Sequence, residues 1–122
     1  MGERRPARVA HLVQAQVAGW LVREAQDPRL RGVTVTAVRM TPDLRIAHVY
    51  FRTLGGAEAG PDALRALERA APVVRGEVGR ALGLRVTPEF RFAYDTLPDT
   101  AQRVDDLLRG ASRTPDGDED DA

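Results

Sequence analysis

The first apolar pattern along the chain is that of a helix. Apolar residues recur three and four positions apart, the spacing that puts side chains on one helical face. They are Val9, Leu12, Val13, Val17, Trp20 and Leu21. The helix is expected to end before Pro28, because the residue before a proline is pushed out of helical backbone geometry. Arg4, Arg8 and His11 fall on the opposite face, so the solvent side of this helix begins basic.

Two strands are predicted next. Residues 33–40 are rich in β-branched side chains and favour a strand. The apolar residues at its start and at its end have opposite parity, so we expect a β-bulge near Ala37. Thr41-Pro42-Asp43 indicates a turn with proline at its second position. Residues 44–53 predict a second strand, in which Ala47, Val49 and Phe51 on a buried face alternate with His48, Tyr50 and Arg52 on a wet face.

A second helix is predicted from Pro61 to Leu82. One apolar stripe keeps its register across about five turns, and its members are Leu64, Leu67, Ala71, Val74, Val78 and Leu82. Pro72 lies in the middle of the helix, where it removes a backbone donor and crowds the carbonyl of Glu68. The helix is therefore expected to bend or break there. Gly83 is suited to the C-terminal cap.

The last apolar patterns complete an α+β fold class. Residues 86–94 alternate as a third strand, and Pro88 suggests that its first part runs along a sheet edge. Residues 99–108 fit a short helix. After Gly110 the sequence turns acidic and nearly free of core residues, so we expect disorder. The predicted organisation is one domain, residues 1–109, followed by an acidic disordered tail, residues 110–122.

Composition excludes several classes of protein. A chain of 122 residues can bury one core but not two independent ones. It contains no cysteine, which removes disulfide frameworks, thiolate nucleophiles and Cys-based metal sites. The Walker loop, the dinucleotide fingerprint, the serine elbow and the paired-histidine metal motif are all missing from the sequence. We therefore expect a protein that is not an enzyme, with no metal, no cofactor and no small-molecule substrate.

The remaining titratable residues have unremarkable settings. His11 and His48 are expected to be surface histidines. Asp105-Asp106 and residues 118–121 are acidic runs, but helix neighbours point about 100° apart and a disordered run has no fixed geometry. Solvated charge is the interpretation we adopt for both. No apolar stretch approaches the ~20 residues of a membrane span, so a cytoplasmic protein with no membrane partner is expected.

The net charge of zero hides an asymmetry. Five acids and one base lie beyond Arg109, which leaves 17 bases against 13 acids in the preceding residues. Every base is an arginine. This usage can reflect genome composition, but the guanidinium also forks onto phosphate and stacks on bases, so the composition is compatible with nucleic-acid binding.

Gly76-Glu77-Val78-Gly79 matches the G-x-x-G loop that clamps a nucleic-acid backbone in KH domains. The apolar stripe of the predicted helix passes directly through this segment, with Val78 in register. The two glycines are therefore expected inside a helix, where packing or simple composition explains them better than a loop does.

The strongest local signal is one face of the second predicted helix. At about 100° per residue, five of its residues lie within roughly 80° of one another and opposite the apolar stripe. They are Arg65, Arg69, Pro72, Gly76 and Arg80, and we call this face the basic ridge. Two interpretations remain open, contact with nucleic acid and a solvated arginine face. Arg4, Arg5 and Arg8 form a second basic cluster at the start of the first helix.

Taken together, several segments resemble the ribosome-binding factor A family. They are an Arg-rich start before a long helix, Asp27-Pro28-Arg29-Leu30, residues 33–38 (VTVTAV), Asp43-Leu44, Ala47-His48-Val49-Tyr50, Arg75 and residues 84–90 (LRVTPEF). Each is weak alone, but they occur in the right order from residue 4 to about residue 95. The resemblance implies a type II KH-like fold, in which a three-stranded sheet packs against helices, and a monomeric protein without catalytic activity.

The resemblance also implies a function. Members of this family are ribosome biogenesis factors that bind the small ribosomal subunit and its 16S rRNA during late maturation and rRNA processing, with ribosomal proteins as further candidate contacts. In the family an Ala-x-Gly kink replaces the KH loop, and Ala70-Ala71-Pro72 stands at the matching positions. Proline in place of glycine still bends a helix but offers no backbone donor.

The candidate RNA-binding residues combine the ridge, the first-helix cluster and the family positions: Arg4, Arg5, Arg8, Arg65, Arg69, Ala70, Ala71, Pro72, Arg75, Arg80 and Arg85. An alternative function is a protein–protein interaction module that uses the wet sheet face around His48, Tyr50 and Arg52 and binds no RNA directly.

Overall fold

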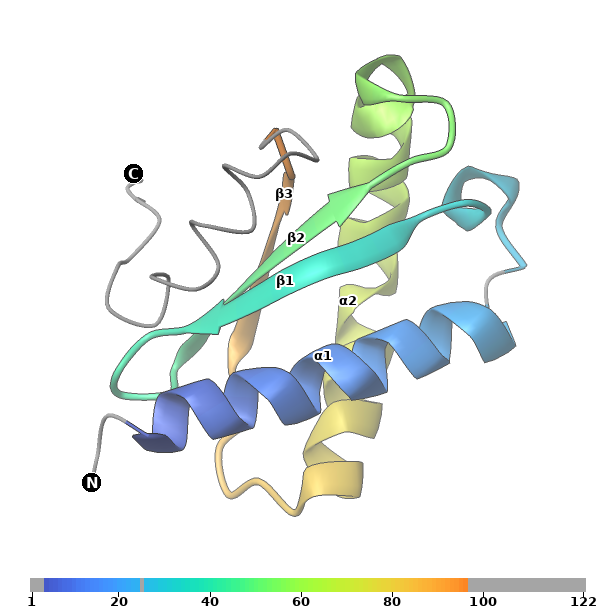
Figure 1. The fold of residues 1–122 in the computed structure, drawn as a ribbon. Coiled ribbons are helices and arrows are strands. Elements are labelled where there is room, and N and C mark those ends of the chain that lie inside the picture. The colour runs from blue at the N-terminus through green and yellow to red at the C-terminus, as the bar shows by residue number, and fades with distance from the viewer. Residues whose placement is uncertain (1–3, 25, 97–122) are drawn as a thin grey trace.

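A computed structural model describes residues 4–24 and 26–96 of the chain, which form two long helices and three strands (Figure 1). In chain order they are α1 (Arg4–Glu24), β1 (Thr34–Met40), β2 (Ile46–Arg52), α2 (Gly60–Leu82) and β3 (Glu89–Tyr94). Two short 3-10 turns, η1 (Pro28–Leu30) and η2 (Ala57–Ala59), precede β1 and α2. The predicted order of the first five elements is confirmed. The predicted helix at 99–108, both acidic runs and the tail lie outside the described residues.

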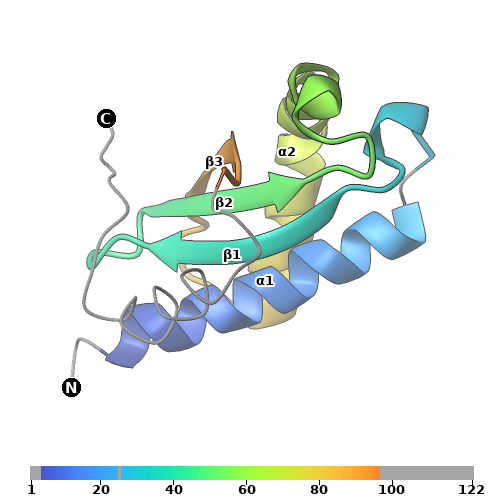
Figure 2. The ribbon, with the colours of Figure 1, turned by 45° about the horizontal axis from the view of Figure 1, so that its top comes forward.

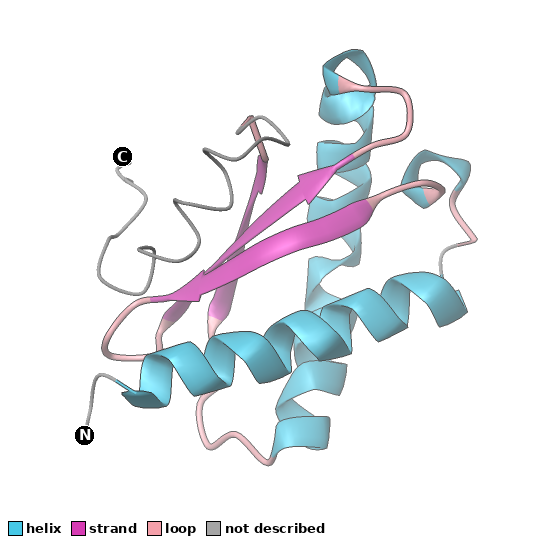
Figure 3. Ribbon diagram, viewed as in Figure 1, coloured by secondary structure: helices cyan, strands magenta, loops and turns pink. Residues whose placement is uncertain are grey.

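The three strands form one mixed sheet in the order β1-β2-β3 (Figure 3). β1 and β2 are antiparallel and are joined by the predicted turn, in which the Leu44 N–H donates to the Thr41 carbonyl at 2.8 Å. β2 and β3 are parallel, so the chain must cross from one end of the sheet to the other between them. α2 makes that crossing, which fixes its position across the sheet (Figures 1 and 2).

The parity change in the first strand is a β-bulge, as the sequence predicts. The register shifts between Val35 and Ala37, so Thr36 has no counterpart in the register of β2. Because of this extra residue, Val35 and Val38 both point into the core, although their spacing would place them on opposite faces of a regular strand. The Thr36 hydroxyl donates to a carboxylate oxygen of Asp95 at 2.5 Å, which ties the bulge to the residue after β3.

One face of the sheet carries the core. Ala47, Val49 and Phe51 of β2 are fully buried, and β1 and β3 add their own apolar residues to the same face. Both helices contribute to this cluster: α1 through Val9, Val13, Val17, Trp20 and Leu21, and α2 through Ala63, Ala66, Leu67, Val74 and Val78. The alternation predicted for β2 is confirmed, since its other residues lie on the opposite face and are only half-buried.

The third strand is shorter than predicted. It begins at Glu89, whose N–H donates to the Arg45 carbonyl at 2.8 Å, because Pro88 has no N–H with which to extend the ladder. The carbonyls of Thr87 and Pro88 instead accept hydrogen bonds from the Arg75 guanidinium on α2, at 3.2 and 2.8 Å. β3 lies at an edge of the sheet, as Pro88 suggested.

α2 continues through Pro72 without interruption, so the alternative of a broken helix at this position is wrong. Pro72 is exposed, and the helix keeps its buried face on both sides of it. A bend at Ala70-Ala71-Pro72 stays a prediction. Gly83 closes the helix in left-handed geometry, and the Leu84 N–H donates to the Gly79 carbonyl at 3.0 Å, which confirms the predicted cap.

The G-x-x-G segment lies inside α2, so its glycines form no phosphate-binding loop. Gly79 is buried, and a Cβ at this position would stand 2.5 Å from the Thr87 hydroxyl oxygen. The loop before β3 therefore packs directly on the helix backbone. At Gly76 a Cβ would meet only an Arg80 guanidinium nitrogen at 3.5 Å, an ordinary contact.

We expect Gly79→Ala to lower the free energy of unfolding by about 1–2 kcal/mol, since overpacking outweighs the gain in helix propensity. Gly76→Ala is the matched control and should raise stability by roughly 0.5–1 kcal/mol, because the added methyl meets no obstacle. Urea unfolding measures both. Adding Thr87→Ala to Gly79→Ala should restore stability, and failure of this rescue would show that the contact is not the cause.

Candidate nucleic-acid interface

The basic ridge is a solvent-facing surface of α2. Arg65, Arg69, Pro72 and Arg80 are exposed, and Gly76 is half-buried beneath the Arg80 guanidinium. The ridge lies opposite the side chains that α2 sends into the core. At 1.5 Å per residue it spans roughly 22 Å from Arg65 to Arg80. The sequence prediction of an exposed arginine face is therefore confirmed.

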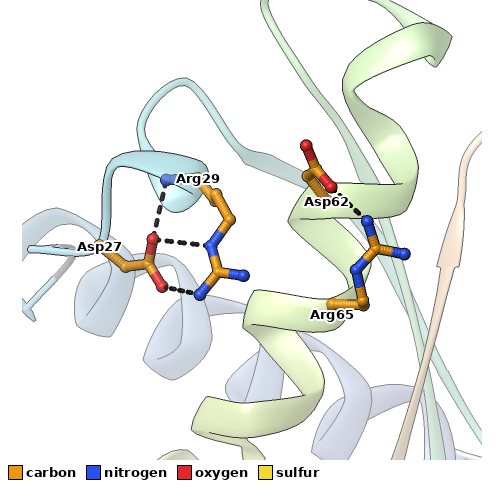
Figure 4. A network of polar contacts seen from close by, with 4 residues as sticks. All are labelled: Asp27, Arg29, Asp62 and Arg65. Atoms are coloured by element: carbon orange, nitrogen blue, oxygen red, sulfur yellow. Dashed lines mark hydrogen bonds and ion pairs between the residues drawn. The ribbon is translucent and has the colours of Figure 1, made fainter.

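The ridge arginines differ in their pairing. Arg65 forms an ion pair with Asp62 one turn earlier, on the exposed first turn of α2 (Figure 4). Arg69 and Arg80 make no hydrogen bond or ion pair with the residues that the structure describes. Exposed Glu68 flanks the ridge on one side. Arg69 and Arg80 are consequently the ridge cations with charge available for a ligand.

A second polar pair stands beside the start of α2. The Asp27 carboxylate accepts three hydrogen bonds from Arg29, from its backbone N–H at 2.9 Å and from its guanidinium at 3.1 and 2.7 Å (Figure 4). These hydrogen bonds lower the pKa of Asp27 to about 2. The guanidinium bonds contribute most, and the backbone bond contributes next. The charge of Arg69 adds a smaller effect in the same direction.

This pair gives a pH-dependent prediction. The pKa of Asp27 is lower in the folded chain than its ordinary value of 3.8, so its contribution to stability is present above pH ~4 and is lost as pH falls through about 2. Asp27→Asn should therefore be less stable than the parent near pH 7, and the difference should shrink toward pH 2. Glu58→Gln, at an exposed acid of η2, is the control and should show no such trend. A pH-independent difference would contradict this account.

Sequence periodicity missed one apolar contributor to the interface. Val73 is 58% exposed, and at about 100° per residue it lies within roughly 40° of Arg69 and Arg80. Val73 is the large apolar residue of the predicted helix that lies outside the apolar stripe, and this position in the sequence could have marked it as exposed. Pro72, Val73 and Gly76, whose side chains are short or absent, thus form an apolar surface between Arg69 and Arg80.

The other α2 candidates have packing roles. Arg75 is half-buried and uses its Nε and Nη2 to hold the carbonyls of Pro88 and Thr87. Ala70 and Ala71 are half-buried, and Ala70 packs against the core. Arg85 is exposed in the loop after α2, at the Arg80 end of the ridge. Arg75 therefore has an internal function, since it holds the residues that lead into β3.

The first-helix cluster is separate from the ridge. Arg5 and Arg8 are exposed on the first turns of α1, next to the turn between β1 and β2 (Figures 1 and 2). The opposite end of α1 meets α2, where Arg23 and Glu77 form an ion pair at 3.2 Å. Arg4 begins α1, and its side chain lies outside the described part of the structure.

Among residues 4–24 and 26–96 there is no group of three metal-ligating side chains. In the same residues, no helix combines the length and the apolar character that a membrane crossing requires. His11 is exposed as predicted, whereas His48 is half-buried on β2 between Arg39 and Arg91. Burial and the charge of Arg91 lower the pKa of His48.

The fold is that of a KH-like α+β domain. It combines a three-stranded mixed sheet, two helices on one face of that sheet and a helix face that carries arginines. The family model described as "Ribosome-binding factor A" matches residues 5–108. This chain belongs to the ribosome-binding factor A family.

Individual relatives support the assignment. A protein of Pseudarthrobacter chlorophenolicus named "Ribosome-binding factor A" is 43% identical over 109 residues, which are 89% of this chain and 62% of that relative. The chain thus spans less than two thirds of its length. The crystal structure of ribosome-binding factor A from Thermus thermophilus is similar with a TM-score of 0.64 and 29% identity, covering 73% of this chain and 94% of that one.

A second Thermus thermophilus structure gives a functional context. It is a homology model of ribosome binding factor A, fitted into the cryo-electron microscopy map of its complex with 30S. Its TM-score to this chain is 0.53 at 38% identity, covering 70% of this chain and 92% of that one.

Proposed function

We propose that this chain is a non-enzymatic ribosome biogenesis factor, a cytoplasmic monomer that binds the small ribosomal subunit through 16S rRNA during late maturation and rRNA processing. Family membership and the Thermus relative fitted into a 30S complex support the subunit as the partner. Residues 1–109 would form the RNA-binding unit and residues 110–122 an acidic tail without a core.

The observation that carries the proposal is the pair Arg69 and Arg80. Both are exposed on the face of α2 that points away from the core, and neither is paired with a described residue. Both guanidinium groups are exposed and make no hydrogen bond to a described residue, so a phosphate backbone could bind both. Arg65 and Arg85 extend this surface at its two ends, and Pro72 lies within it, whereas Ala70 and Ala71 are half-buried outside it.

Arg4, Arg5 and Arg8 are assigned to a second contact on the same RNA. Because these residues lie on α1 and the ridge lies on α2, an rRNA helix or two strands would have to reach both helices. Arg75 would act indirectly, by fixing the loop that carries Arg85.

Salt dependence of binding to naked 16S rRNA tests the proposal. Each phosphate contact should add roughly 0.7 to 0.9 to the log-log slope of affinity against salt, because binding releases counterions. A steep slope supports direct RNA contact. An affinity for small subunits with no affinity for naked 16S rRNA would favour the alternative, a protein interaction module on the sheet face around His48, Tyr50 and Arg52.

A further inference from the structure

The basic ridge has an uncharged centre between two of its arginines. At about 100° per residue, Arg69, Pro72, Val73 and Arg80 all lie within roughly 60° of Gly76 around α2. Along the helix axis, Arg69 lies about 10 Å before Gly76 and Arg80 about 6 Å after it. Pro72 is exposed and Val73 is 58% exposed. We call Pro72, Val73 and Gly76 the apolar patch.

Gly76 is not required by the packing of the fold. A glycine inside a helix is less favourable than an alanine. Contact with Thr87 explains the glycine at position 79, because a Cβ there would stand 2.5 Å from the hydroxyl oxygen. Among the described residues, a Cβ at Gly76 would contact only the Arg80 guanidinium, at 3.5 Å. The helix backbone at Gly76 is therefore open to a ligand from solvent.

The Arg80 guanidinium lies over the patch. Its Nη1 comes close to Gly76, one helical turn before Arg80 itself, as expected for long side chains that lean toward the start of their helix. Neither Arg69 nor Arg80 is hydrogen-bonded or ion-paired to another described residue. A guanidinium in this position can stack on a base and still donate to a phosphate.

The acids of α2 leave this charge available. They are Asp62, Glu68 and Glu77. Asp62 is paired within the ridge, and Glu77 is paired with an arginine of α1. Glu68 is exposed and lies roughly 100° from Arg69 around the helix. The apolar patch is therefore flanked at both ends by cations, which complement the phosphates on either side of a base.

The uncharged centre favours one form of RNA over the other. A duplex keeps its bases stacked inside and presents phosphates and sugars, which gain nothing from contact with Pro72 or Val73. An unpaired strand can splay a base out, so that the base covers apolar side chains while its neighbouring phosphates remain within reach of arginines.

We propose that the apolar patch and its flanking arginines bind single-stranded RNA, with one unpaired base on the patch and the adjoining phosphates on Arg69 and Arg80. This inference rests on the proposed rRNA binding for the source of the RNA. It adds the kind of RNA that the ridge accepts.

The first test compares one 12-nucleotide RNA as a single strand and annealed to its complement. Fluorescence anisotropy with the full chain measures both affinities, and the length lies within the range of single-strand sites. The single strand should bind more tightly by about five- to a hundredfold, the contribution of one stacked base. Equal affinity for the two forms, or tighter binding of the duplex, would overturn the proposal.

Gly76→Leu fills the patch and displaces the Arg80 guanidinium. It should weaken single-strand binding by about five- to a hundredfold and leave duplex binding nearly unchanged. Gly19→Leu is the matched control, since Gly19 lies inside α1 and a Cβ there would meet nothing within 4 Å. Gly19 is also followed four residues later by an arginine, but Arg23 is held by its ion pair with Glu77.

Val73→Asn tests the patch without changing a glycine. It should weaken single-strand binding about three- to tenfold, because the base loses an apolar contact. Val22→Asn on α1, where the valine is 86% exposed, is its control and should bind like the parent. Circular dichroism checks the fold of each variant. Parental single-strand affinity in folded Gly76→Leu and Val73→Asn proteins would overturn the proposal.

The ridge variant Arg69→Gln/Arg80→Gln separates this inference from the proposed function, and it should weaken binding of both RNA forms. If it does so while Gly76→Leu and Val73→Asn change neither, the ridge binds phosphates alone and only the inference fails. If the parent binds neither RNA form but still co-sediments with small subunits, direct RNA contact is refuted, and the proposed function fails with it.

Discussion

Changing Arg65, Arg69 and Arg80 together to glutamate is expected to abolish binding to the small subunit while the protein remains folded. All three side chains are exposed on the side of α2 away from the core, and surface substitutions of this kind usually cost less than ~0.5 kcal/mol. Binding should fall because three attractive phosphate contacts become repulsive. Circular dichroism checks the fold, and co-sedimentation measures the binding.

The single variants rank the three positions. Arg65 already pairs with Asp62, so Arg65→Glu should weaken binding less than Arg69→Glu or Arg80→Glu. Arg45→Glu makes the same change in net charge at an exposed position in the turn between β1 and β2, beside Arg5 and Arg8, so its effect on binding reports on the second contact and not on the ridge. If the folded triple variant binds with parental affinity and salt slope, the contact belongs to Arg4, Arg5 and Arg8 instead.

Pro72→Ala is expected to change stability and binding in opposite directions. An alanine restores the backbone donor to the carbonyl of Glu68, and exposed Pro72 gives up little burial. A helix-interior proline costs about 3 kcal/mol relative to alanine, partly offset by the smaller entropy of the unfolded chain, so we expect a gain of about 1–2 kcal/mol. Subunit binding should weaken, because the variant favours a straighter α2 and moves the two halves of the ridge.

Pro61→Ala is the matched control for this experiment. Pro61 lies in the first turn of α2, where a missing N–H costs no helical hydrogen bond, so its replacement should leave stability and binding nearly unchanged. Urea unfolding and co-sedimentation measure both variants. Parental subunit affinity in a stabilised Pro72→Ala protein would mean that the proline has no part in binding.

Local patterns in the sequence predicted the elements well. The period of the apolar residues located both long helices, and the parity change in the first strand located the β-bulge at Thr36. The cap at Gly83 and the exposed ridge follow from the same local geometry. These features depend on residues within one or two turns of each other, which periodicity describes directly.

Such local patterns could not predict contacts between residues that are far apart in the sequence. The sequence placed Arg75 among the candidate RNA-binding arginines. In the structure its guanidinium donates hydrogen bonds to two carbonyls more than ten residues away. Gly79 is buried because Thr87 packs on it, and the pairing of Arg65 but not Arg69 depends on side-chain placement. The arginines that can bind a ligand could therefore be separated from the structural one only once α2 and β3 were placed together.

Co-sedimentation with purified small and large ribosomal subunits over a range of salt concentrations tests the central claim most directly. The parent should pellet with the small subunit and not with the large one, and its affinity should fall steeply as salt rises. Arg69→Gln/Arg80→Gln should flatten the log-log slope by roughly 0.7 to 0.9 for each lost phosphate contact. Equal pelleting with both subunits, or small-subunit binding with the same slope in parent and variant, would contradict the account.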